Sequence, residues 1–201
     1  MTFLYFNGCS YTFGGELDDR NGQRFSTLVS NHFKADHLND SIGGASNDLI
    51  TMRTLEFLEN NICDHAIIML THCERVHFNK KLIPTKDSIF YENYYNDEVG
   101  ALNFYKNRYI LEQEFEKKNI PLLLLQYHNV YADNIWSRNC KGKLQTIANS
   151  NIMDREKTLL GRRKNKKYYY SDTKKRSLCH FNIEGHKRVA DYIIGKLTST
   201  I

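Results

Sequence analysis

Short apolar segments alternate with amphipathic segments along much of this chain, and this alternation restricts its fold more than any other feature. The apolar segments are expected to form buried strands at residues 2–7, 66–70 and 122–126, and residues 36–39, which are only weakly marked, could form the second strand. Segments with apolar residues at helical spacing are expected to form helices at residues 25–33, 46–59, 101–118 and 183–197. Strands and helices that alternate in this way are typical of a parallel sheet covered by helices on both faces.

Length and composition indicate one globular domain over residues 1–201. Hydrophobic residues make up 41% and charged residues 25% of the chain, which excludes disordered and fibrous classes. No apolar run reaches the 18 residues of a membrane span, and the first residues lack a basic leader, so we expect a cytoplasmic protein. Residues 77–100 and 128–167 have no clear period and are expected to be insertions that shape or cover a site.

A basic segment near the C-terminus is the one feature that could indicate nucleic-acid binding. Residues 162–167 and 174–176 are mostly Lys and Arg, and they flank three consecutive tyrosines at 168–170. Basic residues beside aromatic ones can hold a phosphate backbone with stacked bases. The net charge of only +5 favours the alternative, a solvated loop that keeps the protein soluble.

The five cysteines are scattered, and none of them forms a CxxC pair, so we expect reduced thiols rather than disulfides. The predicted fold brings several soft ligands to one sheet edge, namely Cys9, His72, Cys73, Cys179 and His180. Such a cluster could bind zinc, or a thiol could act as nucleophile. Free cysteines are more often small buried residues of the core, so we predict that the protein binds no metal and no cofactor.

A candidate nucleophile follows the first strand, in the sequence Gly-Cys-Ser-Tyr-Thr-Phe-Gly at residues 8–14. A serine on a tight turn from strand to helix lies at the sheet edge, where backbone amides can face its oxygen. This arrangement suits Ser10 as an acyl-transfer nucleophile. A plain turn with a helix-capping serine would have the same sequence.

Two further segments sit where the same chemistry needs them. A glycine-bearing turn at residues 39–47 enters a helix after the second strand, and its backbone N–H groups could stabilise an oxyanion. His180 lies just before the last predicted helix, and His186 lies in the first turns of that helix. We expect His186 to pack against or cap the last helix, and it is the fallback base if His180 points away.

The chain order and the local residues resemble the SGNH (GDSL-type) hydrolase family, and the short bacteriophage-encoded members look especially similar. The first family block matches at Gly8, Ser10, Thr12 and Gly14, with Cys9 replacing the usual aspartate. The second block matches at Asn39 and Gly44. The last block matches at His180, Asn182, Gly185 and His186, with Phe181 replacing proline, and the phage-like members also share Thr71, Glu74 and Arg75.

This resemblance implies a three-layer α/β/α sandwich with a flavodoxin-like parallel sheet. It also implies that Ser10 attacks an ester carbonyl, that His180 accepts its proton, and that the amides of Ser10 and Gly44 hold the oxyanion. The implied substrate is a small-molecule or glycan ester, such as an O-acetylated carbohydrate. No metal or organic cofactor is implied.

The sequence departs from the family pattern at two positions. The third block normally carries an asparagine that donates to the oxyanion; residues 70–74 have none, and His72 or Asn47 are the candidates to replace or support it. The aspartate that normally precedes the histidine is also missing, since Ser177 and Leu178 occupy those places. Asp172 or a backbone carbonyl could orient His180 instead.

These departures leave a second reading open. A catalytically degenerate protein could keep the SGNH fold as a binding or structural module, with the basic segment as its contact surface. The sequence does not indicate an oligomeric state.

Overall fold

The computed structural model describes residues 1–126, except 74, 79–80, 84–89, 91–93 and 96, together with residues 180–198. Its main sheet has four parallel strands in the order β2-β1-β3-β6. Their bounds are β1 (Phe3–Gly8), β2 (Asp36–Asn39), β3 (His65–Leu70) and β6 (Leu122–Gln126). In this order β2 lies on one side of β1, and β3 and β6 lie on the other, as in flavodoxin-like sheets. Sheets of this kind bind ligands where the order changes side, here at the carboxyl ends of β1 and β3.

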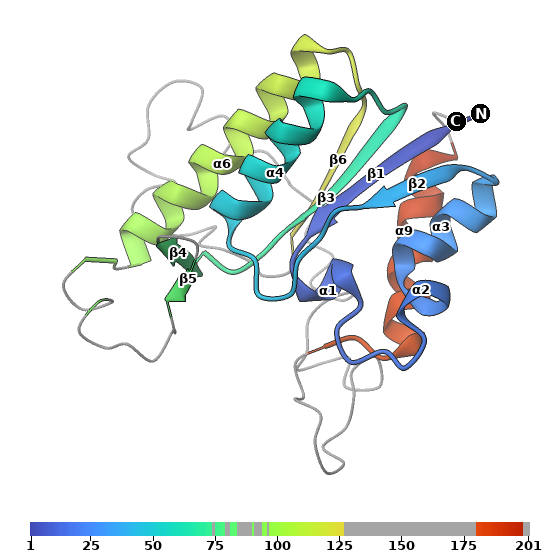
Figure 1. Ribbon diagram of the computed structural model, residues 1–201, viewed down its shortest axis with the longest axis horizontal. Helices are drawn as coiled ribbons and strands as arrows, with labels where there is room; N and C mark the ends of the chain where they lie inside the picture. Colours follow the sequence, from blue (N-terminus) through green and yellow to red (C-terminus); the bar gives the residue numbers. More distant parts are fainter. Residues whose placement is uncertain are drawn as a thin grey trace.

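Two pairs of helices cover the sheet. On one face α4 (Asn47–Asn60) packs against α6 (Asp97–Lys117), and on the other α3 (Phe25–Phe33) packs against α9 (Ile183–Leu197). Figure 1 shows the sheet between these two pairs, so the predicted three-layer α/β/α architecture is confirmed. No described helix is long and apolar enough to cross a membrane.

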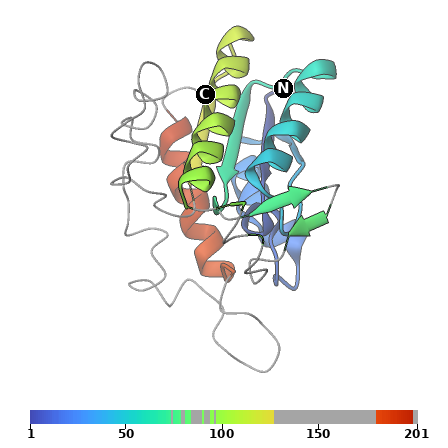
Figure 2. The same cartoon turned by 90° about the vertical axis from the view of Figure 1, so that its left-hand side faces the viewer.

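The ends of the predicted strands and main helices differ from those in the structure by at most four residues, and four of these elements coincide at both ends. The structure adds two one-turn helices, α1 (Ser10–Phe13) and α2 (Arg20–Gln23), which are too short to show a period. It also places an antiparallel hairpin of β4 (Val76–Phe78) and β5 (Lys81–Ile83) in the first insertion, beside α4 (Figure 2). The second insertion, 128–167, and the basic segment lie outside the described residues.

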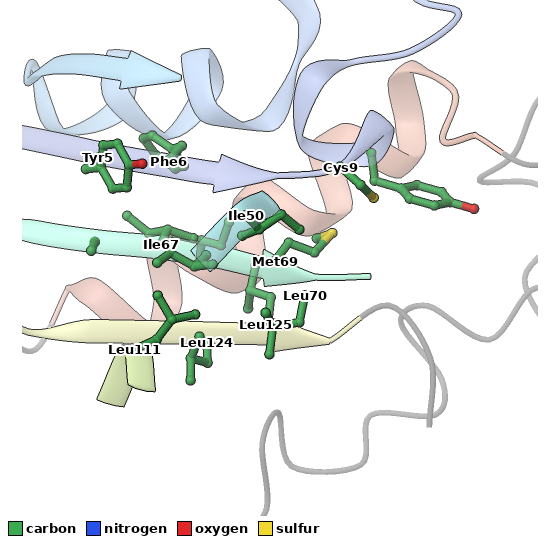
Figure 3. Packing of buried hydrophobic residues seen from close by; sticks show 14 of the residues in the cluster. Tyr5, Phe6, Cys9, Ile50, Ile67, Met69, Leu70, Leu111, Leu124 and Leu125 are labelled. Atoms are coloured by element: carbon green, nitrogen blue, oxygen red, sulfur yellow. The ribbon is translucent and has the colours of Figure 1, made fainter. Parts of the chain in front are cut away.

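The hydrophobic core is centred on β1 and β3. Leu4, Tyr5 and Phe6 of β1 have no exposed surface, and residues 65–70 of β3 are all buried. Figure 3 shows these strands with β6, their side chains packed between the helix layers. Burial on both faces explains why these strands are continuous apolar runs rather than alternating ones.

A buried polar network fixes the carboxyl end of β1. The Asn7 amide donates to the Ile50 carbonyl at 3.0 Å and to Thr54 Oγ1 at 2.9 Å, both on α4. Its carbonyl oxygen accepts from the Gly8 N–H at 2.7 Å. Because buried polar groups without partners are costly, this satisfied network holds the end of β1 in one position against α4.

Candidate active site

Ser10 begins a one-turn helix directly after β1. The Phe13 N–H donates to the Cys9 carbonyl at 2.9 Å, and the Ser10 carbonyl accepts from Gly14 and Gly15 at 3.1 and 2.8 Å. Gly14 ends the turn at a φ of +82°, a conformation that glycine adopts without strain. We call residues 8–16 the nucleophile turn. It lies at the end of the sheet where α9 begins (Figure 1).

Close packing inside the nucleophile turn explains the spacing of Gly8, Ser10 and Thr12. A β-carbon at Gly8 would lie 2.2 Å from Thr12 Oγ1 and 2.9 Å from Thr12 Cβ. Thr12 is fully buried, so it has no room to move aside. Glycine at position 8 therefore lets α1 fold back onto the end of β1, and Ser10 takes its place at the first position of the helix.

The glycine turn after β2 docks against the nucleophile turn. The Ala45 N–H donates to the Ile42 carbonyl at 3.2 Å, and Gly44 has a φ of +81°, as the third residue of a type II turn requires. The Ile42 N–H donates to the Gly8 carbonyl at 3.2 Å, which joins the turn to the end of β1. Within the described residues, the amides of Ser10 and Gly44 have no acceptor.

Asn39 holds the same region together through its side chain. Its amide donates to the Thr12 carbonyl at 2.9 Å and to Ser26 Oγ at 2.7 Å, and its carbonyl oxygen accepts from the Ser41 N–H at 3.2 Å. The asparagine that matched the second family block thus acts on the backbone, linking β2 to the nucleophile turn.

The His180 ring lies against the nucleophile turn. A β-carbon at Gly15 would lie 3.3 Å from both Cδ2 and Nε2 of His180, and the Tyr11 ring centre is 5.3 Å from that of His180. The Nε2 edge of the ring therefore faces the turn that carries Ser10. The structure thus places His180, from the far end of the chain, beside Tyr11 and Gly15 of the segment that also contains Ser10.

The other ring nitrogen of His180 faces the carboxylate of Glu16, a residue that lies outside the matched family blocks. Nδ1 of His180 lies 3.2 Å from Oε1 of Glu16, and both side chains are about one-fifth exposed. The separation is within ion-pair range, although the Nδ1–H direction does not meet the angle of a formed hydrogen bond. Catalytic hydrogen bonds are often misaligned without substrate. Glu16 lies two residues after Gly14, whereas the family pattern predicts the carboxylate just upstream of His180.

Asn47 is bonded to the chain that leaves β3. Its side-chain carbonyl accepts from the Thr71 N–H at 2.8 Å, and its amide donates to the Thr71 carbonyl at 3.3 Å. Asn47 is 1% exposed. This two-bond clamp joins the start of α4 to the end of β3, which fits the supporting role suggested for Asn47. His72, the next residue after Thr71, is half-buried, and its role at the oxyanion stays a prediction.

His186 is part of the core. Its Nδ1 accepts from the Phe25 N–H at 3.2 Å, at the first residue of α3, and its ring stacks on the Phe25 ring. It therefore caps α3 and not the last helix, whose cap is Asn182. Burial, together with the nearby His180, lowers the pKa of His186 to about 3. Its position in the core argues against a role as fallback base.

The neutral His186 should make the stability depend on pH. The unfolded chain takes up a proton near the ordinary pKa of 6.5, but the folded protein does so only near 3. Stability is therefore complete above pH 6.5 and is lost as the pH falls, by about 1.4 kcal/mol per unit. His186→Gln, which keeps an acceptor for Phe25, is expected to be less stable than wild type at pH 7. Urea unfolding from pH 7.5 to 4.5 should show that gap narrowing; a constant gap would contradict the prediction.

The described cysteines are structural in position. Cys9, Cys63 and Cys73 are all buried, and burial with the nearby Asp64 raises the pKa of the Cys63 thiol to about 12. Among the described residues, no three His, Cys, Asp or Glu side chains gather as a metal site would require. Cys179, a member of the soft-ligand cluster considered from the sequence, lies outside these residues.

Comparison with known proteins identifies the fold. No protein-family model matches the chain, and no curated protein sequence does. Among solved structures, a G-D-S-L lipolytic protein from Veillonella parvula has a TM-score of 0.54 at 13% identity, covering 100% of both chains. The esterase EstA from Pseudoalteromonas, inhibited by monoethylphosphonate, has a TM-score of 0.54 at 12% identity, covering 99% of this chain and 98% of that one.

An acetylxylan esterase from Geobacillus stearothermophilus, solved as a catalytic mutant, is also similar. Its TM-score is 0.56 at 14% identity, and the match covers 98% of this chain and 94% of that chain. The fold implied by the motifs is therefore confirmed: this chain has the α/β fold of the SGNH (GDSL-type) hydrolases.

Proposed function

We propose that this protein is a serine hydrolase that cleaves acyl esters, with Ser10 as nucleophile and His180 as general base. The observation that carries the proposal is the position of His180, whose Nε2 edge lies against the turn that carries Ser10. A histidine so placed can accept the serine proton as the serine oxygen attacks.

The reaction follows from these two residues. Ser10 Oγ attacks the ester carbonyl carbon while His180 Nε2 takes the Oγ proton, and the carbonyl electron pair moves to oxygen. When the tetrahedral intermediate collapses, Nε2 returns the proton to the departing alcohol, leaving an acyl-Ser10 ester. Water then attacks this ester, Nε2 takes a water proton, and the acid leaves as the proton returns to Ser10.

The amides of Ser10 and Gly44 are the proposed oxyanion donors. Both are backbone groups on turns fixed by hydrogen bonds, so they need no reorganisation during the reaction. The Asn47–Thr71 clamp and the Asn39 side chain hold the surrounding loops in place. No metal or organic cofactor enters this chemistry.

The proposed substrate class is a small-molecule or glycan ester. An acetylxylan esterase shares the fold, so acetylated sugars belong in the first substrate panel. Simple acetyl and butyryl esters of p-nitrophenol complete it, since they report hydrolysis without requiring recognition of the alcohol.

The test is covalent labelling of the purified protein by a fluorophosphonate, measured by intact mass. One label per chain is expected in wild type, and loss of labelling is expected in Ser10→Ala and His180→Ala. Two controls should still label: His32→Ala, an exposed histidine on α3, and Cys9→Ala, which removes the thiol next to the nucleophile.

Three results would overturn the proposal: no labelling between pH 6 and 9, labelling that persists in Ser10→Ala, or loss of labelling in Cys9→Ala with the fold intact. The first would favour the reading as a degenerate binding module. Salt-dependent binding to nucleic acid would then be the next measurement.

A further inference from the structure

We propose that Glu16 is the positioning residue for His180, taking the place of the aspartate that the chain lacks upstream of that histidine. This inference rests on the proposed function, and it assigns the third member of the catalytic group to the nucleophile turn itself. In this arrangement one segment of nine residues supplies both the nucleophile and the group that orients the base.

The contact geometry supports this assignment. Glu16 Oε1 is 3.2 Å from Nδ1 of His180, whereas the other ring nitrogen, Nε2, lies 3.3 Å from the β-carbon position of Gly15. A carboxylate beside Nδ1 favours the tautomer with its proton there, which leaves the Nε2 lone pair for the serine proton. It also stabilises the imidazolium that forms when Nε2 accepts that proton. The carboxylate itself takes up no proton during the reaction.

The backbone of Glu16 is held in a turn. Its φ is +71°, in the left-handed region that a non-glycine residue adopts at a cost. The two other described non-glycine residues with positive φ, Lys34 and Asn119, lie at the ends of long helices, where this conformation is a common cap. Glu16 is instead the third residue of a turn in which the Leu17 N–H donates to the Gly14 carbonyl at 3.3 Å, and a positive φ belongs to that position of a type II turn. This turn fixes the backbone from which the carboxylate reaches His180.

Labelling kinetics test the charge of Glu16. Glu16→Gln keeps the shape and removes the charge, and we expect its fluorophosphonate labelling to slow by at least about 10²-fold, toward the roughly 10⁴-fold loss known for orienting carboxylates. The matched control is Glu184→Gln, which removes a carboxylate four residues after His180 that is 63% exposed. Its labelling rate should equal that of wild type. Equal rates for Glu16→Gln and wild type would overturn the proposal while leaving the hydrolase intact.

Chemical rescue separates positioning from a structural role. Glu16→Gly should fold, since glycine adopts the positive φ without strain, and should label as slowly as Glu16→Gln. Added formate or acetate should restore part of its rate, because the deleted side chain leaves space beside Nδ1. The same salts should not accelerate Glu184→Gln. Failure of both anions to rescue a folded Glu16→Gly would count against positioning.

The tautomer of His180 can be read without any activity. In protein with ¹⁵N-labelled histidine, the His180 signals are assigned by their loss in His180→Ala. We expect wild type to carry the proton on Nδ1 and Glu16→Gln to show a shifted tautomer ratio. An unchanged tautomer ratio in Glu16→Gln would overturn the proposal, even if no fluorophosphonate labels the wild type. A protein that fails to label yet shows this shift would disprove the hydrolase function and retain the Glu16–His180 coupling.

Discussion

The Ser10→Ala/His180→Ala double variant is expected to hydrolyse p-nitrophenyl acetate no more slowly than either single variant. Each single change should lower kcat by about 10⁴- to 10⁶-fold, because nucleophile and base act in one step and removal of either abolishes that step. If the two residues acted independently, the fold-decreases in kcat of the two single variants would instead multiply in the double variant. The measurement is the steady-state rate of all four proteins, corrected for hydrolysis by buffer alone.

The control for this cycle pairs Ser10→Ala with His32→Ala, since His32 is exposed on α3 and outside the proposed site. The fold-decrease in kcat of that double variant should equal the product of the fold-decreases of the two single variants. Because His32→Ala alone should leave kcat nearly unchanged, the double variant should be about as slow as Ser10→Ala. If Ser10→Ala and His180→Ala multiply in the same way, the two residues do not act as a unit. The proposed mechanism would then be wrong even if each residue affects the rate.

The architecture could be predicted from the sequence because burial determines the pattern of its strands. The run at 66–70 is apolar throughout, the run at 122–126 is apolar at every position but the last, and in the structure both strands lie between two helix layers. A periodic pattern reports which face is buried, and that is enough to predict strands, helices and the edge where they end. It reports nothing on one-turn elements such as α1, which only the structure shows.

The carboxylate proposed to orient His180 could not be predicted because the two residues are distant in the chain. The family pattern places that group just before His180, at positions where this chain has Ser177 and Leu178, whereas Glu16 lies beside the ring only in the folded structure. A positive φ at a non-glycine residue also has no sequence signature. Similarly, His186 looked like a candidate base because a sequence does not show that a ring nitrogen accepts from a buried backbone amide.

Gly8→Ala is expected to destabilise the protein by about 3 kcal/mol, near the upper end of what overpacking a core costs. The added methyl group would lie 2.2 Å from Thr12 Oγ1, 2.9 Å from Thr12 Cβ and 3.0 Å from the Met69 carbonyl oxygen. None of these atoms belongs to the free end of a flexible side chain, so β1, β3 or α1 must shift. Guanidinium chloride unfolding, with the midpoint and slope both fitted, measures the loss.

Gly195→Ala is the matched control, because a β-carbon there has nothing within 4 Å on the exposed side of α9. It should raise stability by about 0.5 kcal/mol, since alanine is the better helix former. Thr12→Ala added to Gly8→Ala removes the closest clash and should recover part of the loss, but not all, because the Met69 carbonyl remains. Equal unfolding midpoints for Gly8→Ala and wild type would show that the nucleophile turn can relax. The requirement for glycine in this motif would then need a different cause from close packing beneath Ser10.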